Sequence, residues 1–542
     1  MGGLENNKRM FIAICIVGLF GIITVALTAA TLGTLNKRFD SIVSPPISTT
    51  NKPKLNSILA ETIRIEDLMT HLRQLQRIAD EYNGTRAINT RGFNETVNYI
   101  EKYLKEQGNG LKVMRETFQI RNFAIATDPI LLSLINGTEK NYTYSSKLAR
   151  SDFTYVTYST AADFPNYVRV INIPNFGCAK NEWQNATDLV ALVKAGGSCT
   201  YAEKGILAGK NGVKALLFYN DEEANANLAP ISVRLRETNK LPALYLSYAV
   251  GQALANATIF TTVMVKLSIQ LQNLGTFPVD NICADTIHGN ITQTIVVGSH
   301  SDSVPAGPGI NDNGEGSGTA ANLVLAANLA RLYQTTNYTK YKYRVRFCWW
   351  AAEEIGLAGS SYHVQQTYTA TTPGERRTDY LINLNFDMAG SPNFIFGIYD
   401  ANTASNATPP QAIPGSKKVT ELYRDWFIGQ NLPWDYRAFN GRSDYGPFLE
   451  ACIAAGGVAT GSDAAKTADQ REKYRQSVGE NNAGFAGAIL DPCYHQPCDT
   501  LANIHQFGYE KLIQAAAYGL EYLGQQPNLL EWLYPNGQAC EL

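Results

Sequence analysis

From Asn281 onward the sequence alternates between apolar runs and segments typical of loops and helices. The runs cover residues 295–298, 343–350 and 381–386, and an Ala-rich helix is expected over residues 318–332. Such alternation is typical of strand–helix–strand units, whose parallel strands need helices on both faces of the sheet. We therefore predict an α/β fold, a three-layer sandwich with a mostly parallel central sheet. Sheets of this kind bind ligands at the carboxyl ends of their strands.

Residues that can bind a metal ion follow these predicted strands. They are His300, Asp312, Glu353-Glu354, Asp387 and, later in the chain, His495. Two adjacent glutamates directly after an apolar run are costly to bury without a cation or hydrogen-bond donors. The Gly- and Asn-rich loop around Asp312 lacks GxGxxG and the Walker lysine, and its aspartate would repel phosphate. A cation site explains this set of residues better than a phosphate site.

The motifs around these residues resemble those of a known enzyme family. His-x-Asp, Asn-Asp-Asn-Gly, Glu-Glu, Asn-Phe-Asp and Tyr-His-Gln occur in the order found in the secreted and vacuolar two-zinc aminopeptidases, the aminopeptidase Y-like family. The similarity covers roughly residues 60–525. It implies a zinc-dependent aminopeptidase that holds two Zn²⁺ per chain and acts on peptides with a free N-terminus.

The resemblance also assigns the metal ligands. One zinc ion would be bound by His300 and Asp387, the other by Glu354 and His495, with the carboxylate of Asp312 bridging both. Imidazole and carboxylate ligands suit zinc sites that keep room for water. Two such ions can share one carboxylate.

Three further residues receive roles from the same motifs. Asp302 would orient the imidazole of His300, Glu353 would be the general base, and Tyr494 would donate a hydrogen bond to the tetrahedral oxyanion. Neighbouring residues of an extended strand end point in opposite directions, so Glu354 is expected to face the metal while Glu353 faces the substrate.

The resemblance places substrate recognition in two segments, residues 441–448 and 454–458. Their small, neutral residues favour an apolar side chain such as leucine, and Glu353 and Asp387 would help to bind the free amine. A carboxypeptidase or dipeptidase of the same superfamily stays an alternative, because Arg442 could bind a substrate carboxylate. A receptor-like pseudoenzyme, similar to the transferrin receptor, is a further alternative that the complete ligand set disfavours.

The remaining sequence divides into an insert and terminal segments. Residues 128–270 form short strand-like runs without a catalytic constellation, and they resemble a protease-associated domain, predicted to be a β-rich insert. The peptidase domain would then cover residues 59–127 and 271–525, followed by a C-terminal tail over residues 526–542. A net charge of -2 and the lack of a basic stripe argue against nucleic-acid binding.

The N-terminus predicts export. Residues 1–9 form a short cytoplasmic tail, and residues 10–32 are apolar enough for a transmembrane signal-anchor, or alternatively a cleaved signal peptide. Residues 33–58 are predicted as a stalk. The catalytic domain would be extracellular or lumenal, in the vacuolar or secretory route, or secreted after cleavage. The oligomeric state stays open.

Glycosylation sequons and cysteines agree with export. Asn-x-Thr sequons begin at Asn83, Asn94, Asn136, Asn141, Asn185, Asn256, Asn290, Asn337 and Asn406. Disulfides are predicted between the close pairs Cys178 with Cys199 and Cys493 with Cys498. Partners for Cys283, Cys348, Cys452 and Cys540 cannot be chosen from the sequence.

Overall fold

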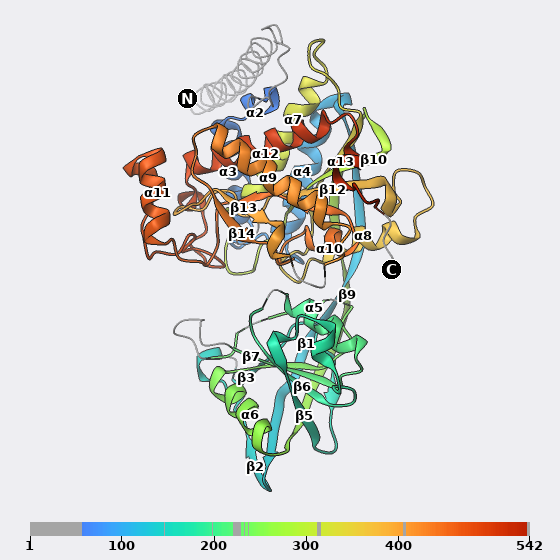
Figure 1. Cartoon of the computed structure of the whole chain (residues 1–542), viewed down its shortest axis with the longest axis vertical. Coiled ribbons are helices and arrows are strands. Elements are labelled where there is room, and N and C mark those ends of the chain that lie inside the picture. The colour runs from blue at the N-terminus through green and yellow to red at the C-terminus, as the bar shows by residue number, and fades with distance from the viewer. Residues whose placement is uncertain are drawn as a thin grey trace, which may run out of the picture.

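The computed structural model describes residues 57–538 except residues 146, 198, 221–228, 232, 237, 312–315 and 405–407. The chain forms two lobes (Figure 1). They are connected by two long antiparallel strands, β1 (Leu111–Ile135) and β9 (Val263–Thr286), which run from one lobe into the other. The predicted boundaries of the insert, 127/128 and 270/271, therefore fall inside continuous strands.

The central sheet of the larger lobe has the order β15-β12-β10-β11-β9. Its strands are β10 (Asn290–His300), β11 (Tyr343–Trp350), β12 (Tyr380–Asn385) and β15 (Ala454–Gly456). These four pair in parallel, and β9 joins β11 in antiparallel orientation. The three predicted strands and the mostly parallel sheet are thus confirmed.

Alternating side chains of the sheet divide between two cores, as the period of two in a strand requires. Ile295 and Val297 of β10 belong to the large core, whereas Val296 points to the opposite face. The large core includes residues of α2 (Ile58–Glu61), α3 (Ile65–Glu81), α4 (Arg91–Glu106), α7 (Gly316–Leu332), α9 (Ile413–Gly429), α12 (Gln506–Gly524) and α13 (Leu529–Leu533). The opposite face is covered by α8 (Ala358–Thr369) and α10 (Gly446–Glu450).

Smaller elements complete this lobe. A second sheet has the order β14 (Asp435–Ala438), β13 (Gly397–Asp400), β16 (Val458–Ala459), and α11 (Ala468–Val478) follows it. Across both lobes, the described residues also form the 3-10 helices η1 (Gly108–Gly110), η2 (Leu148–Arg150), η3 (Pro174–Gly177), η4 (Lys180–Trp183), η5 (Arg377–Asp379), η6 (Ala401–Thr403), η7 (Glu480–Asn482) and η8 (Leu501–Asn503).

The smaller lobe is the insert. Its strands are β2 (Thr138–Asn141), β3 (Phe153–Tyr155), β4 (Ala162–Asp163), β5 (Val168–Ile173), β6 (Val190–Lys194), β7 (Ala215–Tyr219) and β8 (Ala243–Leu246). Strands β5 to β8 are parallel. Helix α6 (Tyr248–Phe260) packs on one face of them, and α5 (Tyr201–Lys210) packs on the other.

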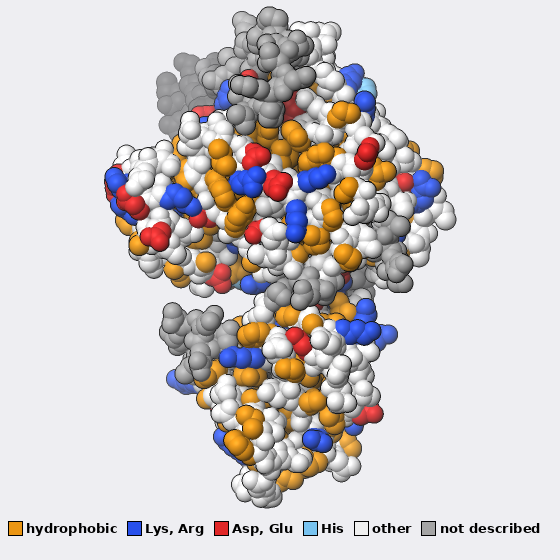
Figure 2. Space-filling model, viewed as in Figure 1, with side chains coloured by type: hydrophobic (Ala, Val, Ile, Leu, Met, Phe, Trp, Pro, Cys, Tyr) orange, Lys and Arg blue, Asp and Glu red, His pale blue; other side chains and the backbone are white. Residues whose placement is uncertain are grey.

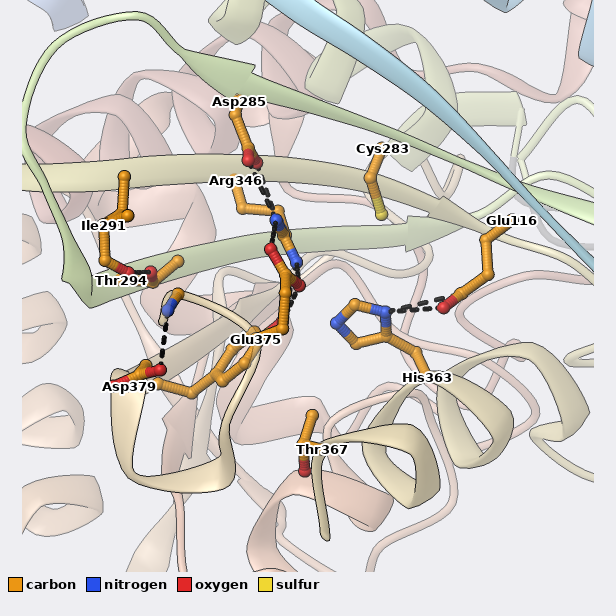
Figure 3. Close-up of polar contacts among 12 residues, drawn as sticks. Glu116, Cys283, Asp285, Ile291, Thr294, Arg346, His363, Thr367, Glu375 and Asp379 are labelled. Atoms are coloured by element: carbon orange, nitrogen blue, oxygen red, sulfur yellow. Dashed lines mark hydrogen bonds and ion pairs between the residues drawn. The ribbon is translucent and has the colours of Figure 1, made fainter. Parts of the chain in front are cut away.

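A cluster of buried charges lies on the α8 face of β11 (Figure 3). The guanidinium of Arg346 donates to both oxygens of Asp285 at 2.7 and 2.8 Å and to both oxygens of Glu375 at 2.6 and 2.7 Å. Beside it, His363 of α8 lies 3.3 Å from the carboxylate of Glu116 in β1. Bidentate pairing compensates the cost of burying Arg346, which is 2% exposed.

Three disulfides are present among the described residues. Cys178–Cys199 and Cys493–Cys498 form the two predicted pairs. The third, Cys283–Cys348, joins β9 to β11 across the central sheet, where strand register places these residues opposite each other. Their separation of 65 residues gave no indication of this pairing.

In the part of the chain that the structure describes, no helix is long and apolar enough to span a bilayer. The predicted span over residues 10–32 lies outside the described residues. Eight sequon asparagines are exposed, and the ninth, Asn406, lies outside the described residues. On the face shown in Figure 2, lysine and arginine side chains are interspersed with acidic ones and form no continuous basic field.

Candidate metal centre and active site

The proposed ligands come together because β10 lies between β11 and β12 in the central sheet and is parallel to both. The carboxyl ends of the three strands therefore meet at one edge of the sheet. His300 ends β10 and is in register with Trp350, which ends β11. Glu353-Glu354 follow the end of β11, and Asp387 follows the end of β12.

Distances among these side chains are short enough for neighbouring pairs to share a metal ion. Nε2 of His300 lies 4.0 Å from Oε2 of Glu353 and 4.0 Å from Oδ1 of Asp387. Nε2 of His495 lies 3.4 Å from Oε2 of Glu354. Two ligand atoms that each lie about 2.0–2.2 Å from one zinc ion are separated by about 3–4 Å. The imidazole and carboxylate donors thus fit zinc in both type and spacing.

Asp302 contacts both His300 and the backbone of the two adjacent glutamates. Its Oδ1 lies 3.4 Å from Nδ1 of His300, and its two oxygens accept hydrogen bonds from the backbone N–H groups of Glu353 and Glu354 at 3.1 and 3.2 Å. Asp302 is fully buried. Nδ1 of His300 also lies 3.2 Å from the backbone carbonyl of Asp302, so Asp302 contacts both the imidazole and the glutamate backbone.

The glutamates lie in a turn, and not in the extended strand end that the sequence predicted. Strand β11 ends at Trp350, and Ala352 and Leu357 have φ values of 59° and 58°. The left-handed conformation at these residues is costly and needs support from surrounding contacts. One ligand atom of each glutamate lies within 4.8 Å of a ring nitrogen of His300.

Asn281 of β9 closes this turn at its base. Its Oδ1 accepts a hydrogen bond from the N–H of Ala351 at 2.9 Å, and its Nδ2 donates to the carbonyl of Gly359 at 3.0 Å. The same Nδ2 donates to Glu116 at 2.8 Å. A Cβ at Gly359 would lie 2.3 Å from Oδ1 of Asn281, so glycine is needed for this close approach.

The His495 loop is closed by a disulfide. Cys493–Cys498 spans five residues, and His495 between them has a φ of 54°. The ring of Tyr494 stacks on the imidazole of His495 with centroids 4.1 Å apart. The short covalent loop and the stacked ring restrict the orientations that His495 can adopt.

The pKa shifts at this edge reflect crowded carboxylates. Burial lowers the pKa of His300, but the negative charges of Glu353, Asp302 and Asp387 outweigh it and raise this pKa well above its usual value. Burial raises the pKa of Glu353 well above its usual value, and His300 opposes this shift. A divalent cation would favour the charged form of such carboxylates, as the proposed ligand set requires.

Two residues next to Asp387 were not assigned roles from the sequence. The hydroxyl of Ser443 donates to Oδ2 of Asp387 at 2.6 Å. Asp444 is fully buried and accepts a hydrogen bond from Ser360 at 2.5 Å. Burial raises the pKa of Asp444 to about 7, with His300 opposing the shift. The segment 441–448 thus supports Asp387.

Residues 454–458 form β15, Gly457 and the start of β16, and they are buried inside the fold. A Cβ at Gly456 would lie 2.5 Å from Val419 of α9, which packs against this strand. The small residues therefore allow the strand and helix to pack closely. Close packing thus accounts for the small residues at 454–458 without a substrate pocket.

Asn311 links three loops of the site. Its side chain donates to Oδ2 of Asp491 at 2.5 Å and accepts from the N–H of Gly390 at 2.7 Å, while its own N–H bonds both oxygens of Asp499 at 3.0 and 3.1 Å. Asp491 and Asp499 flank His495 in the sequence, and Gly390 follows Asp387. The predicted bridging ligand Asp312 itself lies outside the described residues.

Arg86 supports the same region from the segment before α4. Its fully buried guanidinium donates to the carbonyls of Ser301, Pro308 and Gly309 at 2.8, 2.9 and 2.5 Å. These carbonyls belong to the loop that follows His300. No local signal identified Arg86, because a single arginine before a helix is typical of an exposed surface.

The comparisons with known proteins agree with this geometry. The sequence profile of peptidase family M28 matches residues 281–519, and that of the PA domain matches residues 164–254. Probable leucine aminopeptidase 2 of Aspergillus fumigatus is 33% identical to this chain over 475 residues, which are 86% of this chain and 85% of the relative. Aminopeptidase Y of Saccharomyces cerevisiae is 29% identical over 478 residues, which are 86% of this chain and 79% of the relative.

A solved structure shares the fold. The aminopeptidase from Aneurinibacillus sp. strain AM-1 superposes with a TM-score of 0.55 at 20% sequence identity. The match covers 89% of this chain and 97% of that chain. The α/β architecture with its PA insert therefore has an experimentally observed counterpart.

Proposed function

This chain belongs to peptidase family M28, and we propose that it uses a centre of two zinc ions to release apolar N-terminal residues from peptides. That it is a zinc-dependent metallo-aminopeptidase follows from the family and from its aminopeptidase relatives. The number of ions, the residue roles and the preferred substrate are the proposal. The observation that carries it is the convergence of His300, Glu353, Glu354 and Asp387 at one edge of the sheet, with His495 beside Glu354.

The side chains fall into two ligand pairs. His300 with Asp387 would hold one zinc ion, Glu354 with His495 would hold the second, and Asp312 would bridge them. The 4.0 and 3.4 Å separations within the two pairs support this division. When bound, zinc ions supply Lewis-acid polarisation of the scissile carbonyl and lower the pKa of water at the site.

Glu353 would act as the general base. Its side chain is 13% exposed, which keeps it accessible from solvent, while its backbone is held by Asp302. Its carboxylate would accept the proton of the attacking water and then donate it to the leaving amine.

Two residues would assist this reaction. Tyr494, held beside His495 by ring stacking, would donate its hydroxyl hydrogen bond to the oxyanion that develops at the carbonyl. Asp302 would orient His300. Neither role requires a large movement, because both side chains already lie next to a proposed ligand.

The substrate is proposed from the acidic site and from relatives. Glu353 and Asp387 present carboxylates that would bind the free ammonium group of a peptide. The Aspergillus fumigatus relative is named probable leucine aminopeptidase 2, which supports an apolar first residue. Residues 441–448 are the proposed wall for that side chain, since Ser443 contacts Asp387 directly.

The proposed compartment is the secretory or vacuolar route, with residues 10–32 as a membrane anchor or a cleaved signal. Eight exposed sequon asparagines and three disulfides among the described residues support an oxidising, glycosylating compartment. Sequencing the mature N-terminus of the expressed protein tests this: a start after residue 32 would remove the anchor, and an intact N-terminus would support it.

The function is tested by comparing a Leu-initiated peptide with its N-acetylated form. We expect hydrolysis of the free peptide only, loss of activity after chelation, and recovery when zinc is added. Equal hydrolysis of the acetylated peptide would refute the requirement for a free amine. The number of ions is tested separately by metal analysis of the dialysed protein, where a value near one zinc per chain would contradict the paired centre.

A further inference from the structure

The insert touches the turn that carries the proposed base. Ile355, directly after Glu354, is partly buried and packs against both the large core of the peptidase lobe and the core of the insert. At the next residue, Gly356, a Cβ would lie 3.2 Å from the carbonyl oxygen of Leu235 in the insert. The turn over residues 353–357 is therefore in direct contact with the insert.

The contacting part of the insert is firmly held within that lobe. Leu235 is fully buried, and its N–H donates to the carbonyl of Thr157 at 2.9 Å. The N–H of Thr157 donates in turn to the carbonyl of Val233 at 3.0 Å. The segment from Val233 to Arg236 is thus fixed within the insert. Because this segment contacts the turn, a shift of the insert would also shift Ile355 and Gly356.

A second contact joins the insert to α10. The guanidinium of Arg236 forms an ion pair with the carboxylate of Glu450, the last residue of that helix. Helix α10 begins two residues after Asp444, and the preceding Ser443 binds Asp387. Both contacts therefore reach elements that hold or follow residues of the proposed active site.

Beside the ion pair the lobes are separated by a cavity of about 260 Å³, lined among others by Arg236, Gly356, Tyr362 and Glu450. The two lobes are thus not packed continuously here. Partial packing of this kind leaves the relative position of two lobes dependent on a few contacts. In Figure 1, α5 of the insert lies at the end of that lobe nearest to the peptidase lobe.

We propose that the insert is a positioning element of the active site, which acts through Ile355 and the Arg236–Glu450 ion pair. Together they hold the 353–357 turn in the orientation in which Glu353 faces the substrate. This inference rests on the proposed role of Glu353 as base. Asp302 and Asn281 hold the turn from the peptidase side, and the insert holds it from the opposite lobe.

The expected consequence is a loss of turnover without a loss of folding. A partly exposed ion pair contributes little to overall stability. Reversing one of its charges, however, sets like charges opposite each other and drives the contact surfaces apart. Because a displacement of about 1 Å at a catalytic group can lower a rate by about a hundredfold, kcat should respond while zinc binding and KM do not.

The test compares Arg236→Glu, Glu450→Arg and the double charge swap in the full chain. We expect each single variant to lose about tenfold in kcat with unchanged zinc content, KM and Tm. The swap should recover to within about twofold of the wild type, because the opposite charges face each other again. Ile355→Ala removes the apolar contact without a charge and should also lower kcat. Arg471→Glu, which breaks the exposed Arg471–Glu480 pair within the peptidase lobe, is the matched control and should leave kcat unchanged.

Single reversals with wild-type kcat, or a double variant as slow as the single ones, would overturn the inference. Glu353→Gln is measured in parallel to separate this failure from that of the proposed function. An active Glu353→Gln enzyme refutes the base itself. An inactive Glu353→Gln enzyme together with unaffected charge reversals refutes only the role of the insert.

Discussion

Nδ2 of Asn311 donates a hydrogen bond to Oδ2 of Asp491 across 2.5 Å, which ties the loop after β10 to the loop that holds His495. The same side chain accepts a hydrogen bond from Gly390, three residues after Asp387. Three segments that are far apart in the sequence thus meet at one buried amide. The spacing of the proposed ligands depends on this amide as well as on the sheet.

Asn311→Ala should weaken zinc binding. Without the amide, the carboxylate of Asp491 and the N–H of Gly390 lose a partner, and the ligand loops lose a common anchor. We expect zinc affinity to fall by about 10–100-fold, measured by competition with a chelator of known affinity. Asn482→Ala, which removes only a hydrogen bond to the carbonyl of Val478, is the control. Equal zinc affinity of the Asn311 variant and the wild type would contradict this role.

Exchange of each glutamate for glutamine should distinguish the role of Glu353 from that of Glu354. Glu353→Gln should retain zinc but lose about 10²–10⁴-fold in kcat, because an amide cannot accept the proton of water. Glu354→Gln should lose zinc, because an uncharged amide is a poorer zinc ligand than a carboxylate. Metal analysis and kcat are measured on the same preparations. If both variants kept their zinc and their activity, neither assignment would stand.

Arg86→Met should destabilise the fold and also weaken zinc binding, because Arg86 holds the loop that follows His300. The substitution leaves the buried carbonyls of Ser301, Pro308 and Gly309 without the donors that Arg86 supplies, at a cost of about 3 kcal/mol. Thermal unfolding without zinc measures the loss of stability, and its shift on addition of zinc measures the loss of zinc binding. Zinc should raise the Tm of the wild type more than that of the variant, since a ligand that binds the folded state more tightly stabilises it more. Arg424→Met, which removes an exposed arginine that binds Asp425, should change neither quantity.

Stability at acid pH should depend on Glu375, which is drawn with its partners in Figure 3. Burial favours the neutral acid, but the hydrogen bonds and charge of Arg346 outweigh it and lower the pKa of Glu375 from 4.5 to about 2. The folded protein therefore binds this proton less readily than the unfolded chain. The stabilisation is complete above pH 4.5 and is lost as the pH falls towards 2.

Glu375→Gln tests this dependence. At pH 7 the variant should unfold at lower urea concentration than the wild type, and the difference should shrink between pH 4.5 and 2. Glu66→Gln, which changes an exposed glutamate of α3, is the control and should unfold like the wild type over this pH range. A difference between wild type and Glu375→Gln that stays constant over this range would show that Arg346 does not stabilise the charged carboxylate.

The strands, and the polar residues that follow them, could be predicted from the amino-acid sequence alone. Near-continuous apolar runs specify buried strands through local hydrophobicity, and helical segments between them require parallel pairing. Residues placed after such strands must gather at one edge of the sheet. For that reason His300, Glu354 and Asp387 could be grouped before their distances were measured. Motif similarity then added His495, which no local pattern connects to the others.

The groups that hold these residues in place could be identified only in the folded chain. Asp302 reaches the backbone of Glu353, Asn311 reaches Asp491, and Cys283 pairs with Cys348, each across a separation set by strand order and loop packing. Ile355 packs against the insert because the paired strands β1 and β9 place that lobe beside the 353–357 turn. Contacts of this kind form when separate segments pack against each other, and the hydrophobic pattern of each segment alone does not specify its neighbour.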